Sequence, residues 1–242
     1  MHIERVTFLV DEYPTEEYYP FTLPTFRETR GIDFQSPVTL FVGENGSGKS
    51  TLLQAIANRC GIHIWKTIET SRYEINPYEQ LLWRFIDVKW VDGYVHGSFF
   101  SSQMFHDFAR NLDEWAVSDP EMLKYFGGKS LMTQSHGQSL MSYFGSRYRI
   151  KGLYIMDEPE TALSPKTQIA LLRLLEEISV AGHAQFIIAT HSPILLSCEG
   201  AQIYSFDRIP ISEVVYEETE HYQVYRDFMM EMVEKLESKH TT

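Results

Sequence analysis

Nine residues near the N-terminus constrain the fold of this chain more than any other feature of its sequence. Residues 43–51 read GENGSGKST and match the pattern GxxxxGK(S/T). A short apolar run at 38–42 precedes them, and residues 50–59 carry apolar side chains at helical spacing. A glycine-rich loop between a buried strand and a helix surrounds phosphate oxygens with backbone N–H groups. The motif therefore predicts a nucleotide-binding α/β fold.

The residue types of this loop point to ATP and Mg²⁺ as cofactors. We expect Lys49 to place its charge on the β and γ phosphates and the Ser50 hydroxyl to coordinate the metal. The predicted nucleotide-binding residues are Gly43, Asn45, Gly46, Ser47, Gly48, Lys49, Ser50 and Thr51. A second segment, 128–130, copies only the end of the motif, because Leu123 stands where the first glycine belongs. We interpret that segment as an ordinary loop.

A second apolar strand ends in two carboxylates. Residues 152–157 form an apolar run that closes with Asp157, and Glu158 follows it. At the end of a strand, Asp157 can hold the Mg²⁺ hydration shell, and Glu158 can orient or deprotonate the attacking water. A solvated acidic turn is the alternative interpretation. The phosphate loop upstream favours the catalytic one.

Strands and helices alternate along much of the chain. Residues 164–182 begin with serine and proline, carry apolar side chains at helical spacing and end at a glycine. Residues 184–190 follow as another apolar strand. The alternation predicts a mostly parallel central sheet. We expect one P-loop NTPase domain over residues 1–242, with an antiparallel N-terminal β portion that includes a strand at 2–10, and an inserted helical lobe.

Residues 62–134 form the candidate lobe. All four tryptophans lie in this range, with many of the tyrosines and phenylalanines. The dipeptide Asp92-Gly93 is a strong turn signal and predicts a β-hairpin over 84–95. Residues 101–126 have helical character. The range is therefore expected to be an aromatic-rich lobe that leads to the segment beginning at Ser135.

Taken together, these segments and three others resemble the ABC ATPase superfamily. Residues 135–139, which read SHGQS, resemble its signature motif. Residues 160–164 resemble its D-loop, and His191, after the next strand, resembles its switch histidine. The elements follow one another in the order of that superfamily over residues 43–192.

The resemblance implies a head-to-tail homodimer. Two ATP molecules would be sandwiched, each between the phosphate loop of one subunit and the signature of the other. The signature residues that would contact ATP in trans are Ser135, Gly137 and Gln138. The residues that the resemblance assigns to hydrolysis are Glu158, His191 and Lys49. A helix over 137–148 would direct its N-terminus at the γ-phosphate.

The sequence also departs from the superfamily pattern. His136 replaces the usual glycine of the signature, and Ser164 stands where the D-loop usually has aspartate. For the Q-loop glutamine that touches Mg²⁺, Gln103 is the candidate and Gln80 the rival. Four aromatic residues are available for stacking on adenine, and we select none of them: Tyr18, Tyr19, Phe21 and Phe26.

One branch of the superfamily is especially similar. Residues 186–196 and 216–222 resemble segments of small bacterial stand-alone ATPases, commonly labelled AAA-family or predicted ABC-type. These ATPases are kin to the heads of SMC-type and recombination-repair proteins. The chain has no long heptad pattern, so it lacks the coiled-coil arm of a full SMC-type protein.

Composition limits the partners and the location. The chain has 21 Lys and Arg against 33 Asp and Glu, a net charge of −12, which argues against binding nucleic acid over most of its surface. A local DNA-binding patch stays open, although the basic residues at 147–151 are expected to be a solvated edge. No apolar run is long enough to span a bilayer, and two cysteines give no disulfide framework, so we expect a cytoplasmic protein. The apolar stripe over 222–233 predicts a terminal helix packed on the sheet, with a partner-binding helix as the second interpretation.

These observations favour an ATP-hydrolysing dimer that acts as a switch on a protein partner or on DNA, in repair or phage defence. The alternative is the nucleotide-binding subunit of a membrane transporter, which would need a clear Q-loop. A sensor that binds but does not hydrolyse ATP is disfavoured by the presence of Glu158 and His191.

Overall fold

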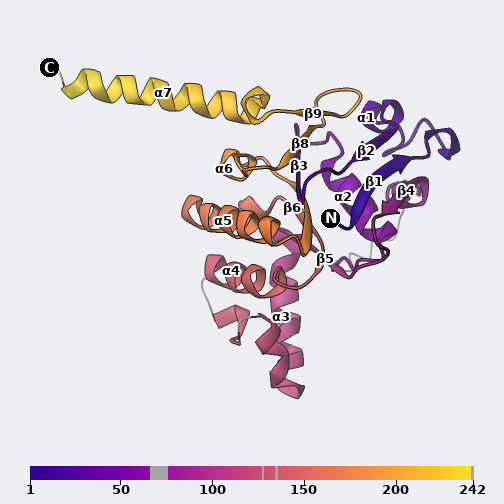
Figure 1. Cartoon of the computed structure of the whole chain (residues 1–242), viewed down its shortest axis with the longest axis horizontal. Coiled ribbons are helices and arrows are strands. Elements are labelled where there is room, and N and C mark those ends of the chain that lie inside the picture. The colour runs from indigo at the N-terminus through magenta and orange to yellow at the C-terminus, as the bar shows by residue number, and fades with distance from the viewer. Residues whose placement is uncertain (66–75, 127, 134–135, 241–242) are drawn as a thin grey trace.

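The fold is built on two β-sheets (Figure 1). The computed structural model describes the chain except for residues 66–75, 127, 134–135 and 241–242. In the described residues, one sheet has six strands in the order β5-β6-β7-β3-β8-β9, and the other has three in the order β2-β1-β4.

The six-stranded sheet is mostly parallel, as predicted. Its strands are β3 (Val38–Val42), β5 (Gly97–Ser101), β6 (Gly152–Asp157), β7 (Ala184–Ala189), β8 (Gln202–Ser205) and β9 (Ser212–Val214). Every pair is parallel except β8 with β9. All residues of β3 and β7 are buried, which explains why both read as continuous apolar runs in the sequence.

The three-stranded sheet is antiparallel and contains the N-terminus of the chain, again as predicted. It consists of β1 (Ile3–Phe8), β2 (Gly31–Asp33) and β4 (Ile86–Trp90). Between β1 and β2 the chain forms a short 3₁₀ helix, η1 (Val10–Glu12), and a one-turn helix, α1 (Pro24–Glu28).

The predicted hairpin over 84–95 is wrong. A turn does occur at Gly93, whose φ is +91°, but the strands on either side of it belong to different sheets. β4 pairs with β1, and β5 pairs in parallel with β6. The Asp-Gly signal reports only the local turn. Burial of Phe99 and Phe100 in the central sheet decides where the following strand goes.

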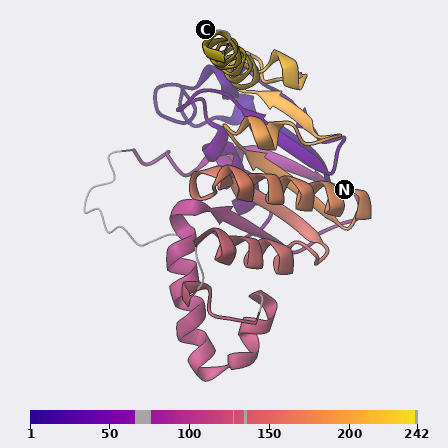
Figure 2. The same cartoon turned by 90° about the vertical axis from the view of Figure 1, so that its left-hand side faces the viewer.

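Helices cover both faces of the central sheet. The helices that follow α1 are α2 (Lys49–Arg59), α3 (Ser102–Ser118), α4 (His136–Arg147), α5 (Pro165–Ala181), α6 (Pro193–Leu196) and α7 (Glu220–His240). Helices α3 to α6 lie on one face, and α2 lies on the other with the small sheet (Figures 1 and 2). Within β3, Leu40 and Val42 face the α3–α6 side and Phe41 faces the α2 side. This alternation follows from the two-residue period of a strand.

The helix α5 begins and ends where its sequence signals predict. The Ser164 hydroxyl accepts a hydrogen bond from Thr167 N at 3.3 Å, Pro165 is the first helical residue, and Gly182 closes the helix with φ +70°. The predicted helix over 101–126 is shorter: α3 ends at Ser118, and Pro120 begins a 3₁₀ segment, η3 (Pro120–Phe126).

Residues 62–134 contribute to both sheets as well as forming α3. Their strands are β4 and β5, and their short 3₁₀ segments are η2 (Leu82–Phe85), η3 and η4 (Leu131–Thr133). The division of the chain into an ATPase domain and an inserted lobe stays a prediction. In the described part of the chain, no helix combines the length and apolar character required to cross a bilayer.

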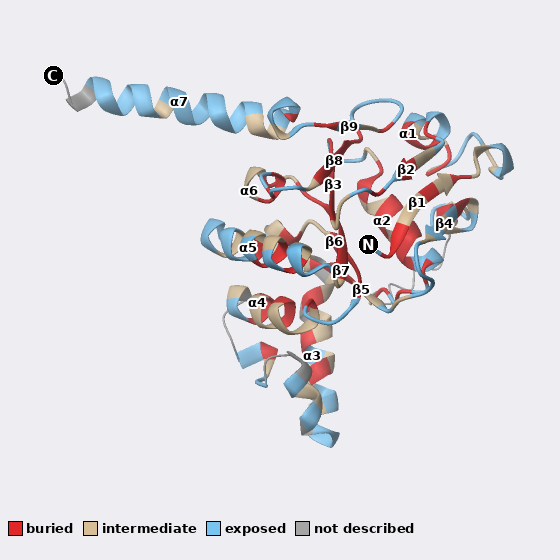
Figure 3. Ribbon diagram, in the orientation of Figure 1, coloured by how far each residue is buried: buried red, intermediate tan, exposed pale blue. Residues whose placement is uncertain are grey.

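The terminal helix α7 does not pack on the sheet, so that prediction is wrong. It contacts η6 (Tyr216–Glu218) and α6 near its start and then projects from the body of the molecule (Figures 1 and 3). Its large apolar side chains are exposed: Val224, Tyr225, Phe228, Met229, Met230, Val233 and Leu236. The apolar spacing predicted the helix correctly but could not say what covers it.

Candidate nucleotide and magnesium site

The predicted phosphate loop joins the end of β3 to the start of α2. Gly46 and Gly48 both have positive φ, +83° and +104°, a conformation that favours glycine. A Cβ at Gly48 would lie 2.7 Å from the ring of Phe26, so a side chain does not fit there either. The loop backbone therefore needs glycine at both positions, and α2 begins directly behind it with its N-terminus available to an anion.

Lys49 is held inside this loop. Its side chain is buried, with only 4% of the residue exposed, and Nζ donates to the carbonyl oxygens of Gly43 at 2.6 Å and Glu44 at 2.9 Å. Burial lowers the pKa of Lys49, while the nearby carboxylates, Glu158 first among them, act in the opposite direction. A buried ammonium group that lies at the N-terminus of a helix and is held by loop carbonyl oxygens is well placed to bind a polyphosphate.

The phosphate loop and the acidic strand meet at Ser50 and Asp157. Ser50 Oγ, in the first turn of α2, donates to Asp157 Oδ1 at the end of β6 at 2.8 Å. Burial raises the pKa of Asp157 to about 6, opposed by this hydrogen bond. The paired hydroxyl and carboxylate oxygens fit Mg²⁺, which takes one or two protein oxygens and completes its shell with phosphate and water. Consistent with that mode, the described residues contain no cluster of three His, Cys, Asp or Glu that could hold a metal alone.

Glu158 occupies a strained backbone position beside the same site. Its φ of 45° and ψ of 57° make it the one non-glycine residue with positive φ in the described ranges. For such a residue the left-handed region costs about 1–2 kcal/mol. The turn that follows, η5 (Pro159–Ala162), directs the chain away from β6. Strain of this kind is retained where the geometry serves a function.

His191 lies opposite Glu158. His191 Nε2 is 3.6 Å from Glu158 Oε1, and both side chains are about one-third exposed. Nε2 of His191 is itself buried and makes no hydrogen bond within the described residues. The pair can therefore position a water molecule and contact a terminal phosphate.

Two further residues hold His191: Glu160, the first residue of the D-loop candidate, and His221, to which the sequence analysis gave no role. Glu160 is partly buried, and its Oε1 accepts a hydrogen bond from the backbone N–H of His191 at 2.6 Å. His221 Nε2, in the first turn of α7, is 2.9 Å from His191 Nδ1. The signal for Glu160 was its place in the D-loop candidate. His221 lies in the segment 216–222 that resembles stand-alone ATPases, but that resemblance gave it no role, and it is 30 residues from its partner along the chain.

An open pocket of about 460 Å³ lies beside this site. It is lined by Glu44 and Asn45 of the loop, by His191, and by Glu220, His221, Val224 and Tyr225 of α7. The phosphate loop is also tied to Asp207, which follows β8, because Glu44 N donates to Asp207 Oδ1 at 2.8 Å. Asp207 is a further residue that the sequence did not indicate.

The four aromatic residues considered for adenine separate into two pairs. Phe21 and Phe26 are fully buried core residues. Tyr19 hydrogen-bonds through its hydroxyl to Thr51 at the end of the phosphate loop, and the ring of Tyr18 lies 5.6 Å from that of Tyr78. Of the four, Tyr19 and Phe26 are therefore the ones that lie against the phosphate loop.

The Q-loop candidate Gln103 lies close to the acidic strand along the sheet. Ser101, the last residue of β5, is the register partner of Asp157, and Gln103 is the second residue of the helix that follows. The side chain of Gln103 lies outside what the structure describes. The rival, Gln80, precedes η2 and leads into the other sheet. The backbone position therefore favours Gln103.

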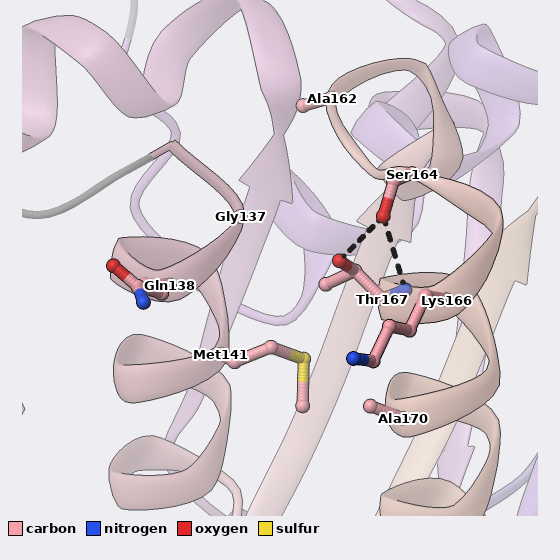
Figure 4. Close-up of a pocket in the computed structure, with 8 residues that line it drawn as sticks. All are labelled: Gly137, Gln138, Met141, Ala162, Ser164, Lys166, Thr167 and Ala170. Carbon is pink, nitrogen blue, oxygen red and sulfur yellow. Dashed lines mark hydrogen bonds between the residues drawn. The ribbon is translucent and has the colours of Figure 1, made fainter.

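Two residues of the signature candidate, Gly137 and Gln138, line a separate pocket (Figure 4). Gly137 and Gln138 lie in the first turn of α4, which confirms the predicted helix, and they line an open pocket of about 400 Å³ with the start of α5. Its other lining residues are Met141, Ala162, Ser164, Lys166, Thr167 and Ala170. A Cβ at Gly137 would lie 3.3 Å from Thr167 Oγ1, so the two helices approach closely there. Ser135 lies outside the described residues.

The two pockets share no lining residue. Lys49, Ser50, Asp157, Glu158 and His191 come together at one edge of the central sheet, and Gly137 and Gln138 belong to a different pocket. This phosphate loop in this sheet defines the class of the protein, a P-loop NTPase.

Comparisons with known proteins agree with that class. Residues 23–61 match a family model described as an AAA domain, and residues 141–197 match one described as an AAA domain, putative AbiEii toxin, type IV toxin–antitoxin system. Protein ea59 of Escherichia phage lambda is 32% identical over 99 residues, which cover 38% of this chain. That match spans only 19% of the phage protein's length.

Solved structures show the same fold at low sequence identity. An ATP-binding cassette of an ABC transporter, in its ADP conformation, aligns with a TM-score of 0.55 at 17% identity, covering 93% of this chain and 98% of that one. CbiO1 of Clostridium perfringens, part of the ABC transporter complex CbiONQ, aligns with a TM-score of 0.51 at 18% identity, covering 98% and 100%. In fold and in its two matched segments, the chain is similar to ATPase domains of the AAA and ABC types.

Proposed function

We propose that this protein hydrolyses ATP with Mg²⁺ and uses ATP binding to form a head-to-tail dimer that switches the state of a partner. One observation carries the proposal. The Ser50 hydroxyl, the Asp157 carboxylate and the facing side chains of Glu158 and His191 are gathered around one glycine loop and its buried Lys49.

Each of these residues has a role in the proposed reaction. Lys49 and the loop N–H groups bind the phosphates, while Ser50 and Asp157 hold Mg²⁺. The metal, when bound, neutralises charge on the β and γ phosphates. Glu158 orients or deprotonates the attacking water, and His191 stabilises the charge that develops on the terminal phosphate. We assign Gln103 to the metal site as its Q-loop glutamine.

The dimer supplies the second half of the ATP site. The separation of the signature pocket from the phosphate-loop pocket supports contacts in trans, with Ser135, Gly137 and Gln138 of one subunit facing the ATP of the other. The N-terminus of α4 would then add its positive end to the γ-phosphate. ATP joins the subunits, and hydrolysis releases them.

A protein is the partner that the surface favours. The apolar side chains of α7 are exposed along one helix, and contiguous apolar surface of this kind marks protein contact sites. The net charge of −12 disfavours DNA over most of the surface. We propose phage defence or repair as the setting.

A transporter subunit is the second candidate function. The two cassettes described above belong to ABC transporters, so the likeness of fold supports it equally. The two candidates differ in what the ATP-bound dimer contacts. Co-purification of a membrane subunit with the tagged full-length protein would favour the transporter and overturn the stand-alone switch.

Light scattering on Glu158→Gln tests the proposed dimer. This variant should bind ATP without hydrolysing it. Its solution mass should double only when Mg-ATP is added. Release of inorganic phosphate by the wild type, absent in the variant, tests hydrolysis. An unchanged monomer mass with ATP demonstrably bound would contradict the sandwich dimer.

A further inference from the structure

The first turn of α7 forms part of the wall of the nucleotide site, and one of its residues touches the switch histidine. His221 Nε2 is 2.9 Å from His191 Nδ1, with the ring centroids 5.0 Å apart and the planes inclined by 46°. The proposed reaction gives no role to His221. Its contact with His191 nonetheless decides which nitrogen of His191 carries the proton.

The proton between the two rings can be placed by accounting for donors and acceptors. A hydrogen bond between imidazole nitrogens needs one N–H and one bare nitrogen. Burial lowers the pKa of both His191 and His221, so both rings are neutral at neutral pH and each carries one proton. Only two arrangements are then available.

In the first arrangement, His191 donates from Nδ1. His221 must then carry its own proton on Nδ1, a buried position that makes no hydrogen bond in the described part of the chain. An unsatisfied buried donor is costly. In addition, the bare Nε2 of His191 would face the Glu158 carboxylate at 3.6 Å, lone pair against negative charge.

In the second arrangement, His221 donates from Nε2. One buried N–H, now that of His191 Nε2, again makes no hydrogen bond in the described residues, but it faces the negative charge of Glu158 instead of opposing that charge with a lone pair. His191 accepts on Nδ1 and carries its proton on Nε2, which faces Glu158. The nitrogen left bare is His221 Nδ1. The N–H of His191 is thus directed toward the side of the site where Glu158 lies, as a donor to a terminal phosphate requires.

We propose that His221 is a positioning residue of the ATP site, which donates to Nδ1 of His191 and holds His191 in the tautomer with its proton on Nε2. This inference rests on the proposed function, because His191 acts there as a hydrogen-bond donor. Fixing a catalytic ring through its second nitrogen is a general way to set tautomer and orientation.

The tautomer can be measured without ATP turnover. Nitrogen-15 NMR of the histidine-labelled full chain at pH 8 separates bare from protonated ring nitrogens, and His191→Gln identifies the His191 signals. In the wild type we expect His191 to show a bare Nδ1 and a protonated Nε2. In His221→Phe we expect the two tautomers to mix. A protonated Nδ1 in the wild type, or signals unchanged in His221→Phe, would overturn the proposal.

Kinetics supply the second arm. His221→Phe keeps an aromatic ring but cannot donate, so kcat should fall by about 10- to 100-fold, the usual cost of losing a residue that orients a functional histidine. KM for ATP should change by no more than about twofold, since phosphate contacts are retained. His221→Gln can place an amide N–H near the position of Nε2 and should restore much of kcat. Equal loss in the two variants would contradict a donor role.

These two arms separate the inference from the proposed function. Glu234→Gln, at an exposed polar position of the same helix, is the control and should retain wild-type kcat. A wild-type protein without ATPase activity would refute the proposed function, while the NMR result would still decide the tautomer. An active wild type with His221→Phe equally active would refute the role of His221 alone.

Discussion

The side-chain amide of Gln185 hydrogen-bonds to the backbone of Ile3 through both its oxygen and its nitrogen. Gln185 Oε1 accepts from Ile3 N at 2.8 Å, and Gln185 Nε2 donates to Ile3 O at 3.0 Å. The same Oε1 accepts from His2 N at 2.6 Å. Gln185 lies on β7 of the central sheet and Ile3 on β1 of the small one, so a single buried side chain joins the two sheets.

Replacement of this glutamine should therefore destabilise the protein. Gln185→Ala leaves the N–H groups of His2 and Ile3 and one carbonyl without a partner in a buried position, at a cost of about 2–5 kcal/mol. Urea denaturation measures it. Gln223→Ala on α7, where the side chain is exposed, should stay within about 0.5 kcal/mol of the wild type. Equal stability of the two variants would show that Gln185 does not join the sheets.

Lys49→Ala should weaken ATP binding by about tenfold or more, because it removes a charge-assisted contact to phosphate. Isothermal titration with Mg-ATP gives the affinity. Lys129→Ala is the matched control, since residues 128–130 copy the end of the phosphate-loop motif yet Lys129 is exposed. A comparable loss in the control would contradict the assignment of Lys49.

Glu158→Gln should lower kcat by about 100- to 10,000-fold while the affinity for ATP stays the same. The amide keeps the shape of the side chain but cannot accept a proton from water. A phosphate-release assay measures turnover. Glu177→Gln, at an exposed carboxylate that pairs with Arg149, should leave turnover unchanged. Turnover retained in Glu158→Gln would remove Glu158 from the reaction.

Ser135→Arg should abolish ATP-dependent dimerisation and leave ATP binding intact, because the added side chain would occupy the place proposed for the partner's ATP. Light scattering in the Glu158→Gln background is the measurement. Gly145→Arg adds the same charge to α4 where nothing lies within 4 Å of a new Cβ, and it should still dimerise. Dimerisation of the Ser135→Arg protein would refute the contact in trans.

Two phenylalanines test whether α7 stands free. Phe228 is 55% exposed and Phe186 in β7 is 0% exposed. Phe186→Ala should cost about 3–5 kcal/mol, and Phe228→Ala less than about 0.5 kcal/mol, in urea unfolding of the full chain. A large cost at Phe228 would mean that α7 packs on the protein in solution.

Much of the fold could be predicted because its signals are local. The phosphate loop, the acidic strand and the helix α5 each carry their glycines, carboxylates or cap within one short segment. The hairpin over 84–95 failed because a turn signal does not specify which strands will pair. The prediction for the packing of α7 failed because an apolar spacing predicts a helix and its apolar face but does not predict which element that face contacts.

The sequence by itself determined the chemistry proposed for the site, namely which residues are expected to bind phosphate and metal and which carboxylate follows them. Only the tertiary structure decided what holds those residues in place. Asp207 and His221 reach the site from elements distant along the chain, and their roles depend on directed hydrogen bonds of 2.8 and 2.9 Å. Such contacts arise from the packing of strands and helices that are not neighbours in sequence, so no local pattern encodes them.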